Sequence, residues 1–146
     1  MHVPERLLIA SGPFTGALSA AEAAAALARG VRAAGRPAPD VLALDCREDD
    51  REAVREQLEA AGFEARMRAA RAVVLAFARL EERTLAGSAA FEIATRARQA
   101  GVPSYAVTAH DLLDAFDARI LDLQLVLEAR TARSLSAAGG RLAELA

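Results

Sequence analysis

The carboxylates between residues 45 and 50 form the densest group of chemically capable side chains in this sequence: Asp45, Glu48, Asp49 and Asp50. Clustered carboxylates are the ligands that hard cations such as Mg²⁺ and Ca²⁺ take in proteins. Acidic residues are also favourable at a helix N-terminus, and a helical pattern follows this group directly. We therefore interpret the group as a solvated helix start and predict no metal site.

A second group of residues could hold an anion. The turn Ser11-Gly12-Pro13 follows an apolar run and precedes a helix whose backbone N–H groups could bind an anion, although the proline has no N–H to donate. We favour a structural role for this turn. Arg79 could grip a phosphate or a carboxylate with its planar guanidinium, or pair with Glu81 or Glu82. Ser88 could contact a ligand or cap the helix that follows it.

His110 and Cys46 are two further reactive side chains. His110 follows an apolar run, and we expect it to belong to a helix start, because no serine or cysteine partner is identifiable. Cys46 has no second cysteine to pair with, so we interpret it as a small buried residue rather than a nucleophile. The lack of a disulfide framework favours a reducing, cytoplasmic compartment.

The composition excludes several classes of function. All 18 basic residues are arginine, and the 146-residue chain contains no lysine. A Walker-type phosphate loop and Schiff-base catalysis both need a lysine, so both are excluded. The net charge of −2 argues against a nucleic-acid partner. We expect no membrane partner either, because no apolar run approaches the ~20 residues of a bilayer span and the first residues lack the pattern of a signal peptide.

Apolar runs and helical patterns alternate along the chain. We predict buried strands over residues 6–10, 41–44, 73–77 and 105–107, and a half-buried edge strand over 121–127. Helices are expected up to about residue 34, up to 61, over 63–70, 86–100 and 112–116, and at the end of the chain. Capping boxes are predicted for Ser19 with Glu22 and for Thr108 with Asp111. In the last helix we expect Leu135, Leu142 and Leu145 on one side and a middle weakened by Gly139-Gly140.

This alternation predicts a single α/β domain, a three-layer sandwich around a mostly parallel, Rossmann-like sheet of about five strands. The length also favours one domain. Ligands of such sheets bind outside the carboxyl ends of the strands, at the switch in strand order. The loops to examine are therefore residues 11–18, 45–50, 78–88 and 108–111.

Two of these loops resemble the bacterial glycerate kinase family, whose members transfer the γ-phosphate of ATP to D-glycerate. Residues 9–20, IASGPFTGALSA, resemble that family's opening, A-P-D-S-F-K-G-S-L-S-A. Residues 73–88, VVLAFARLEERTLAGS, resemble its later signature, V-I-T-G-E-G-R-L-D-x-Q-T-L-x-G-K. The likeness continues through Gly101-Val102-Pro103 and so covers most of the chain.

The departures from the family pattern concern the groups that handle phosphate. Gly12 and Thr15 stand where the first motif has Asp and Lys, and Ser88 replaces the closing Lys of the second motif. Phe77 stands where a site glutamate belongs. Phosphoryl transfer needs cations beside the phosphates and carboxylates that hold Mg²⁺ or orient the hydroxyl, so these replacements remove catalytic chemistry.

The residues that the resemblance retains mainly shape loops and pack helices, among them Gly16 and Thr84. Glu81 is a conservative exchange for Asp. Asp45 is the only residue near the place of the family's D-G-G-E-G segment. Only about residues 46–70 separate the two motifs, too few for the second domain that forms the other wall of the family's cleft.

The resemblance therefore implies a glycerate-kinase-like protein that has lost kinase activity and retains a pocket for a small organic acid, another small anion or a nucleotide. The candidate binding residues are Ser11, Gly12, Thr15, Gly16, Asp45, Arg79, Glu81 and Ser88. One alternative is an active kinase, with ATP and Mg²⁺, whose missing wall comes from another protomer or polypeptide. A second alternative is a structural or regulatory homo-oligomer, because surfaces once covered by the lost domain would expose apolar area.

Overall fold

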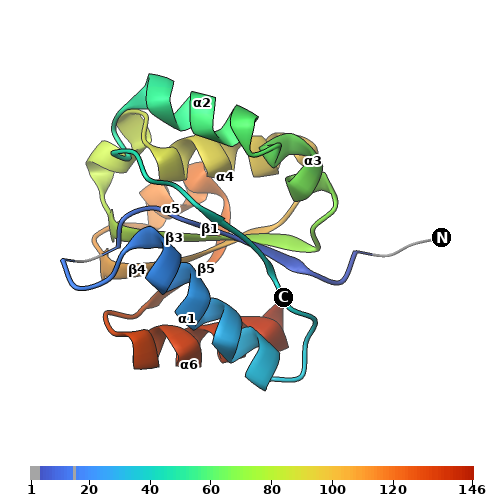
Figure 1. Cartoon of the computed structure of the whole chain (residues 1–146). Coiled ribbons are helices and arrows are strands. Elements are labelled where there is room, and N and C mark those ends of the chain that lie inside the picture. Colours follow the sequence, from blue (N-terminus) through green and yellow to red (C-terminus); the bar gives the residue numbers. More distant parts are fainter. Residues whose placement is uncertain (1–3, 15) are drawn as a thin grey trace.

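The central feature of the fold is a parallel β-sheet, seen in a computed structural model that describes residues 4–14 and 16–146 (Figure 1). Within the described residues the sheet has five strands in the order β2-β1-β3-β4-β5, and all four neighbouring pairs are parallel. The strands are β1 (Leu7–Ser11), β2 (Asp40–Ala43), β3 (Ala72–Leu80), β4 (Ser104–Asp111) and β5 (Leu123–Glu128). The expected three-layer α/β fold is therefore confirmed, with a sheet that is wholly parallel.

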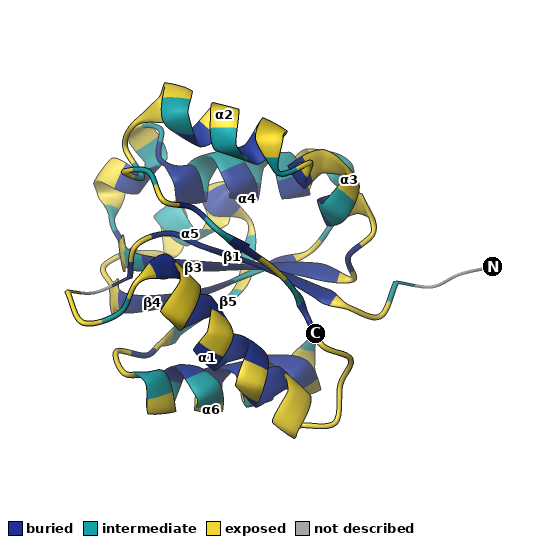
Figure 2. Cartoon of the chain, in the orientation of Figure 1, coloured by how far each residue is buried: buried dark blue, intermediate teal, exposed yellow. Residues whose placement is uncertain are grey.

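Helices cover both faces of this sheet (Figure 1). One face is covered by α1 (Ala20–Ala33) and α6 (Ala132–Leu145). The other face is covered by α2 (Arg51–Ala60), α3 (Phe63–Arg68), α4 (Ala89–Ala100) and α5 (Ala115–Leu121). A short 3-10 helix, η1 (Glu82–Ala86), links β3 to α4. Figure 2 shows buried residues along the sheet and on the helix sides that face it.

The core consists of two hydrophobic clusters separated by the sheet. Leu8, Leu75 and Phe77 belong to the cluster under α2 to α5, whereas Ile9 and Val74 belong to the cluster under α1 and α6. Neighbouring residues of one strand thus serve opposite faces, as the alternation of side chains in a strand requires. All five residues of β1 are buried, which explains why its first four residues are apolar.

Helices α1 and α6 pack closely because glycines lie at their crossing. A Cβ on Gly30 would overlap the Ser136 carbonyl, and a Cβ on Gly139 would overlap the Leu27 carbonyl. The sequence predicts that Gly139-Gly140 weakens the middle of the last helix, but α6 continues through both glycines. Gly139 instead allows the close approach of α6 to α1. The predicted capping box is confirmed: Ser19 Oγ accepts the Glu22 N–H, and Glu22 accepts the Ser19 N–H.

The second predicted capping box is wrong. Thr108 is fully buried within β4, where it is paired with Phe77 of β3 and Glu128 of β5. The strand is longer than its apolar core because its pairing with the long strand β3 continues to Asp111. Helix α5 begins later than expected, and Asp114 is its N-cap, accepting the Asp117 N–H at 2.8 Å.

Three further boundaries differ from the predictions. Leu121 ends α5 instead of starting the last strand, because Asp122 adopts a left-handed backbone (φ 54°) that turns the chain into β5. Residues 78–80 continue β3 instead of belonging to a loop, and α4 starts at Ala89 after η1.

The expectation that Leu145 lies on the same side of the last helix as Leu135 is wrong, because Leu145 is 52% exposed and Leu135 is buried. The two residues are ten positions apart, and at 3.6 residues per turn this spacing rotates Leu145 off the inner side of α6.

The strand order reverses between β1 and β3, and this reversal locates the candidate site. From β1 the chain moves outward to β2, then returns to β3 on the other side of β1 and continues to β4 and β5. In open α/β sheets ligands bind outside the carboxyl ends of the strands at such a switch point. No described helix is long and apolar enough to cross a membrane.

Candidate functional site at the carboxyl ends of β1 and β3

An open pocket of about 520 Å³ lies at the switch point. It is bounded by the turn after β1, the loop after β2, and the segment from the end of β3 to the start of α4. The residues that line it are Pro13, Arg47, Glu48, Asp49, Ala78, Arg79, Glu81, Arg83, Thr84, Ala86, Gly87 and Ser88. Three of the eight predicted site residues, Arg79, Glu81 and Ser88, are therefore brought together here.

Gly12 and Phe77 meet where the two motifs come side by side. The Gly12 N–H donates to the Ala76 carbonyl at 3.0 Å, and a Cβ on Gly12 would lie 2.6 Å from Cε1 of the Phe77 ring. Phe77 is 1% exposed and belongs to the core. The position that the family resemblance assigns to a site glutamate is thus occupied by a buried apolar ring that covers Gly12.

Ser11 and Gly12 serve the turn itself. Ser11 is fully buried, and its hydroxyl donates to the Gly12 carbonyl at 3.0 Å. Neither residue is among the described residues that line the pocket, whereas Pro13 is. The geometry agrees with the structural role that we favour for this turn.

The pocket contains opposite charges that pair with one another. Glu81 forms ion pairs with two arginines, with Oε2 3.6 Å from Arg79 Nε and Oε1 3.2 Å from Arg83 Nη2. Arg47 pairs with Asp49 at 2.9 Å. The arginine side chains are 53% to 89% exposed, so these ion pairs are screened by water and each is weak. Exposed and weakly held guanidinium groups can change partners when an anion enters.

Glu48 is the most perturbed carboxylate of the pocket. Desolvation, followed by the charges of Asp49 and Glu81, raises the pKa of Glu48 from 4.5 to about 6. Its backbone carbonyl accepts the Ala89 N–H at 2.7 Å, which fixes the residue against the first turn of α4. Glu48 therefore gains or loses a proton within the physiological range of pH.

The polar groups at the start of α4 are already used by the protein. Ser88 is buried and is the N-cap: its Oγ accepts the Phe91 N–H at 3.2 Å and donates to the Thr84 carbonyl at 3.1 Å. The sequence left two roles open for Ser88, contact with a ligand and helix capping, and the structure shows the capping role. Gly87 precedes it with φ 114°, a backbone that favours glycine.

None of the other predicted site residues that the structure describes is among those that line this pocket. Asp45 is exposed, and its backbone N–H donates to Gln57 Oε1 at 3.0 Å. Gly16 is exposed, and a Cβ on it would meet no atom within 4 Å, while Thr15 lies outside the described residues. His110 is an exposed strand residue of β4 rather than part of a helix start. Cys46 is partly buried, and desolvation raises the pKa of its thiol.

The acidic group at residues 45–50 is a helix start through Asp50, which caps α2 by accepting the Ala53 N–H at 3.1 Å. The expectation that the whole group is solvated is wrong for Glu48, which is desolvated. Among the described residues no three His, Cys, Asp or Glu side chains are placed to hold a metal ion. The prediction missed Arg47 and Arg83 as pocket residues. Both lie in loops identified from the sequence as candidate binding loops, and that position was the available signal.

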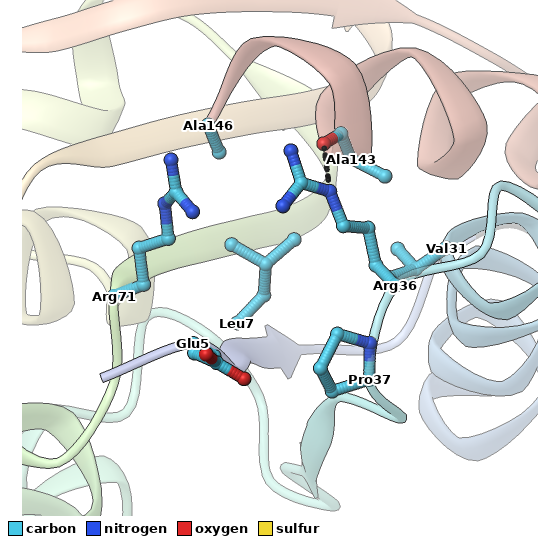
Figure 3. Close-up of a pocket in the computed structure, with 8 residues that line it drawn as sticks. All are labelled: Glu5, Leu7, Val31, Arg36, Pro37, Arg71, Ala143 and Ala146. Atoms are coloured by element: carbon cyan, nitrogen blue, oxygen red, sulfur yellow. Dashed lines mark hydrogen bonds between the residues drawn. The ribbon is translucent and has the colours of Figure 1, made fainter. Parts of the chain in front are cut away.

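A second cavity lies near the amino end of β1 and measures about 10 Å³, room for one water molecule (Figure 3). Arg36 and Arg71 extend beside Leu7 there, and Arg36 Nε donates to the Ala143 carbonyl at 3.1 Å. The cavity is too small for an organic ligand. We regard the pocket at the carboxyl ends of β1 and β3 as the candidate site, because it lies at the switch point of the sheet.

Comparison with known proteins adds no assignment, since no family model and no curated protein sequence matches the chain. The chemistry of the pocket rests on its own groups. Three described arginines and three described carboxylates face an open volume, and one of these carboxylates titrates near pH 6. Such a site can bind an anion by exchange of ion-pair partners.

Proposed function

We propose that this chain is a glycerate-kinase-like protein without kinase activity that binds a small organic acid, another small anion or a nucleotide phosphate at the carboxyl ends of β1 and β3. The observation that carries the proposal is the contact of Gly12 with the buried Phe77 ring, which fills the meeting point of the two motifs with apolar atoms. Phosphoryl transfer needs charged groups at such a point.

Two further features argue against transfer of a phosphoryl group. The Ala89 N–H, at the first position of α4, is bonded to the Glu48 carbonyl, and the Phe91 N–H is bonded to Ser88. Pro13 faces the pocket without an N–H. Backbone donors that could cradle the phosphates of ATP are therefore reduced at both loops.

The arginines support binding of an anion. Arg79 and Arg83 share one carboxylate, Glu81, so one guanidinium can turn to a ligand while the other keeps its partner. Protonation of Glu48 removes a negative charge from the pocket, which favours an anionic ligand below about pH 6. A compact carboxylate or phosphate matches the fork of a guanidinium group.

The proposal is tested by two measurements on the full chain. Incubation with ATP, Mg²⁺ and D-glycerate is expected to yield no phosphoglycerate. A thermal-shift series of small organic acids, inorganic phosphate and nucleotides is expected to show stabilisation by at least one anion, because a ligand that binds the native state raises its melting temperature. Arg79→Ala should reduce that shift, and Arg133→Ala, an exposed arginine of α6, should leave it unchanged.

The results also discriminate the alternatives. Turnover that disappears in Arg79→Ala would overturn the inactive assignment and favour a kinase completed by another protomer or polypeptide. Flat melting curves with every anion would overturn the binding proposal and leave a structural or regulatory homo-oligomer. One observation favours this last function independently, namely an exposed apolar surface at α5.

A further inference from the structure

Exposed apolar side chains concentrate at α5. Among the described residues five large hydrophobic side chains are exposed, and three of them lie within nine residues: Leu112 (54%), Phe116 (69%) and Ile120 (38%). We name these three residues the α5 apolar face. Phe116 and Ile120 are four residues apart and so share one side of the helix, while Leu112 lies in the segment leading into it.

The fold does not need this face for its own core. Helix α5 is anchored from its other side by buried Leu121, and Leu113 packs partly against the same hydrophobic cluster. Its start is capped by Asp114. One side of this short helix already packs on the core, and another side exposes a phenylalanine to water. An exposed apolar surface of this kind marks an interaction site.

The charges beside the face are distributed unevenly along it. Exposed Asp111 and Asp114 lie at the Leu112 end, and partly buried Asp117 follows Phe116 near the centre. Arg119 lies at the Ile120 end together with Arg98, whose Nη1 donates to the Ile120 carbonyl at 3.4 Å. Asp122 is also near that end, which leaves two guanidinium groups against one carboxylate there.

This arrangement is complementary to itself. When a second copy is turned by a two-fold axis through the middle of the face, the acidic end of each copy meets the basic end of the other. Phe116, at the centre, then meets Phe116 of the second copy. Two-fold interfaces use one patch twice, and a patch with opposite charges at its two ends is suited to that symmetry.

We propose that the α5 apolar face is the interface of a homodimer in which two α5 helices pack antiparallel about a two-fold axis near Phe116. The interface uses none of the residues that line the pocket. It therefore goes beyond the proposed function, and the failure of either proposal leaves the other standing.

Sedimentation measurements across a wide range of protein concentration test the proposal. The wild-type chain is expected to dimerise. Phe116→Ser should weaken dimerisation at least about 100-fold, because each dimer loses the burial of two phenylalanine side chains. Leu145→Ser is the matched control: it removes a side chain of similar exposure from α6, and the dissociation constant should stay unchanged.

A charge variant tests the antiparallel geometry. Arg119→Glu should weaken the dimer and reverse its salt dependence, since salt then screens a repulsion instead of an attraction. Thermal unfolding of both variants under dilute conditions should match the wild-type monomer, as the replaced side chains are exposed. A monomer at every concentration would overturn the proposal, and so would a dimer that survives Phe116→Ser or is equally weakened by Leu145→Ser. A monomer that binds a different macromolecule through this face would also overturn it.

Discussion

At the scale of single residues, the contact between Gly12 and Phe77 has two consequences. It joins the turn after β1 to the end of β3, since the Gly12 N–H also bonds to Ala76. It also excludes any larger side chain from position 12 unless the ring moves. A carboxylate at either position would have to be accommodated against the core.

The first prediction concerns Gly12→Ala. The added methyl would lie 2.6 Å from the Phe77 ring, so the variant should lose about 1–3 kcal/mol of unfolding free energy, the usual effect of overpacking. Urea denaturation measures the loss. Gly16→Ala is the control, because its methyl meets no atom within 4 Å, and it should change stability by less than about 0.5 kcal/mol. Equal effects at the two positions would contradict the steric account.

Glu48 provides a second prediction at this scale. Because the pKa of its carboxyl is raised from 4.5 to about 6, the native state binds the proton more tightly than the unfolded chain does. Stability from Glu48 is therefore present below about pH 4.5 and is lost as the pH rises through 6. The loss is at most about 1–2 kcal/mol, because water still reaches part of the side chain.

Glu48→Gln removes this titration while keeping the shape of the side chain. Its stability relative to the wild type should be constant below pH 4.5 and should increase between pH 4.5 and 6. Denaturation curves at closely spaced pH values measure the difference, and subtraction removes the contributions of all other groups. A difference that is the same at every pH would show that Glu48 keeps its ordinary pKa.

At the scale of elements, close packing of α1 on α6 holds one layer of the fold together. Gly30 and Gly139 allow the two backbones to touch, and Gly140 lies beside them with ordinary spacing, since its Cβ would be 3.6 Å from the Gly30 carbonyl oxygen. Adjacent glycines of one helix thus have different roles that the sequence alone does not distinguish.

Gly139→Ala should therefore destabilise the fold, whereas Gly140→Ala should not. Gly139→Ala forces the helices apart and should cost about 3 kcal/mol or more, at the upper end for overpacking. Gly140→Ala should be neutral or stabilise by up to about 1 kcal/mol through helix propensity. Thermal unfolding of the two variants provides the comparison. Equal destabilisation by both variants would show that the closest contact between α1 and α6 does not lie at Gly139.

Another element-scale prediction concerns α3 and the edge strand β2. Arg66 donates to Asp40 from Nε at 2.9 Å and from Nη2 at 2.6 Å, and Nη2 also donates to the Val41 carbonyl at 2.9 Å. The hydrogen bonds from Arg66 lower the pKa of the Asp40 carboxyl below 3.8. This contribution to stability is present above pH 3.8 and is lost as the pH falls through the lowered pKa.

Arg66→Gln should lower the unfolding free energy by about 1.5–3 kcal/mol at neutral pH, the range for hydrogen bonds to charged groups. The difference from the wild type should shrink on acidification below pH 3.8. Equilibrium unfolding at neutral and acidic pH measures both effects. If Arg66→Gln lowered the unfolding free energy equally at neutral and acidic pH, the effect would come from packing of the aliphatic part of the arginine side chain and not from its bonds to Asp40.

At the scale of the whole molecule, protection of the backbone should follow the order of the strands. The central strands β1 and β3 are covered on both faces and paired on both sides, whereas β2 and β5 lie at the edges. Amide hydrogen exchange, measured by mass spectrometry, should be slowest in β1 and β3 and faster in β5, whose residues are half-buried or exposed. Equal protection of β3 and β5 would contradict this architecture and indicate a partner on the open edge.

The fold was largely predictable because its signals are local. The continuous apolar runs at β1 and β3 reflect strands buried on both faces, and the Ser19 box marks the start of α1 through contacts three residues apart. The end of α5 and the length of β4 were not predictable in this way. The length of β4 depends on neighbours distant in sequence, as Thr108 shows by pairing with Phe77 and Glu128, and the end of α5 depends on the left-handed backbone that Asp122 adopts.

The candidate site was predictable in location but only partly in membership. The sequence by itself determined the order of elements, the loops that bound the candidate site and the absence of lysine, because these follow from periodicity, turn residues and composition. Tertiary structure alone decided that Ser11 and Gly12 do not line the pocket, that Arg47 and Arg83 line it, and that Glu48 is desolvated. It also decided that α5 presents Phe116 to water, because burial and charge environment depend on contacts between segments far apart in the chain.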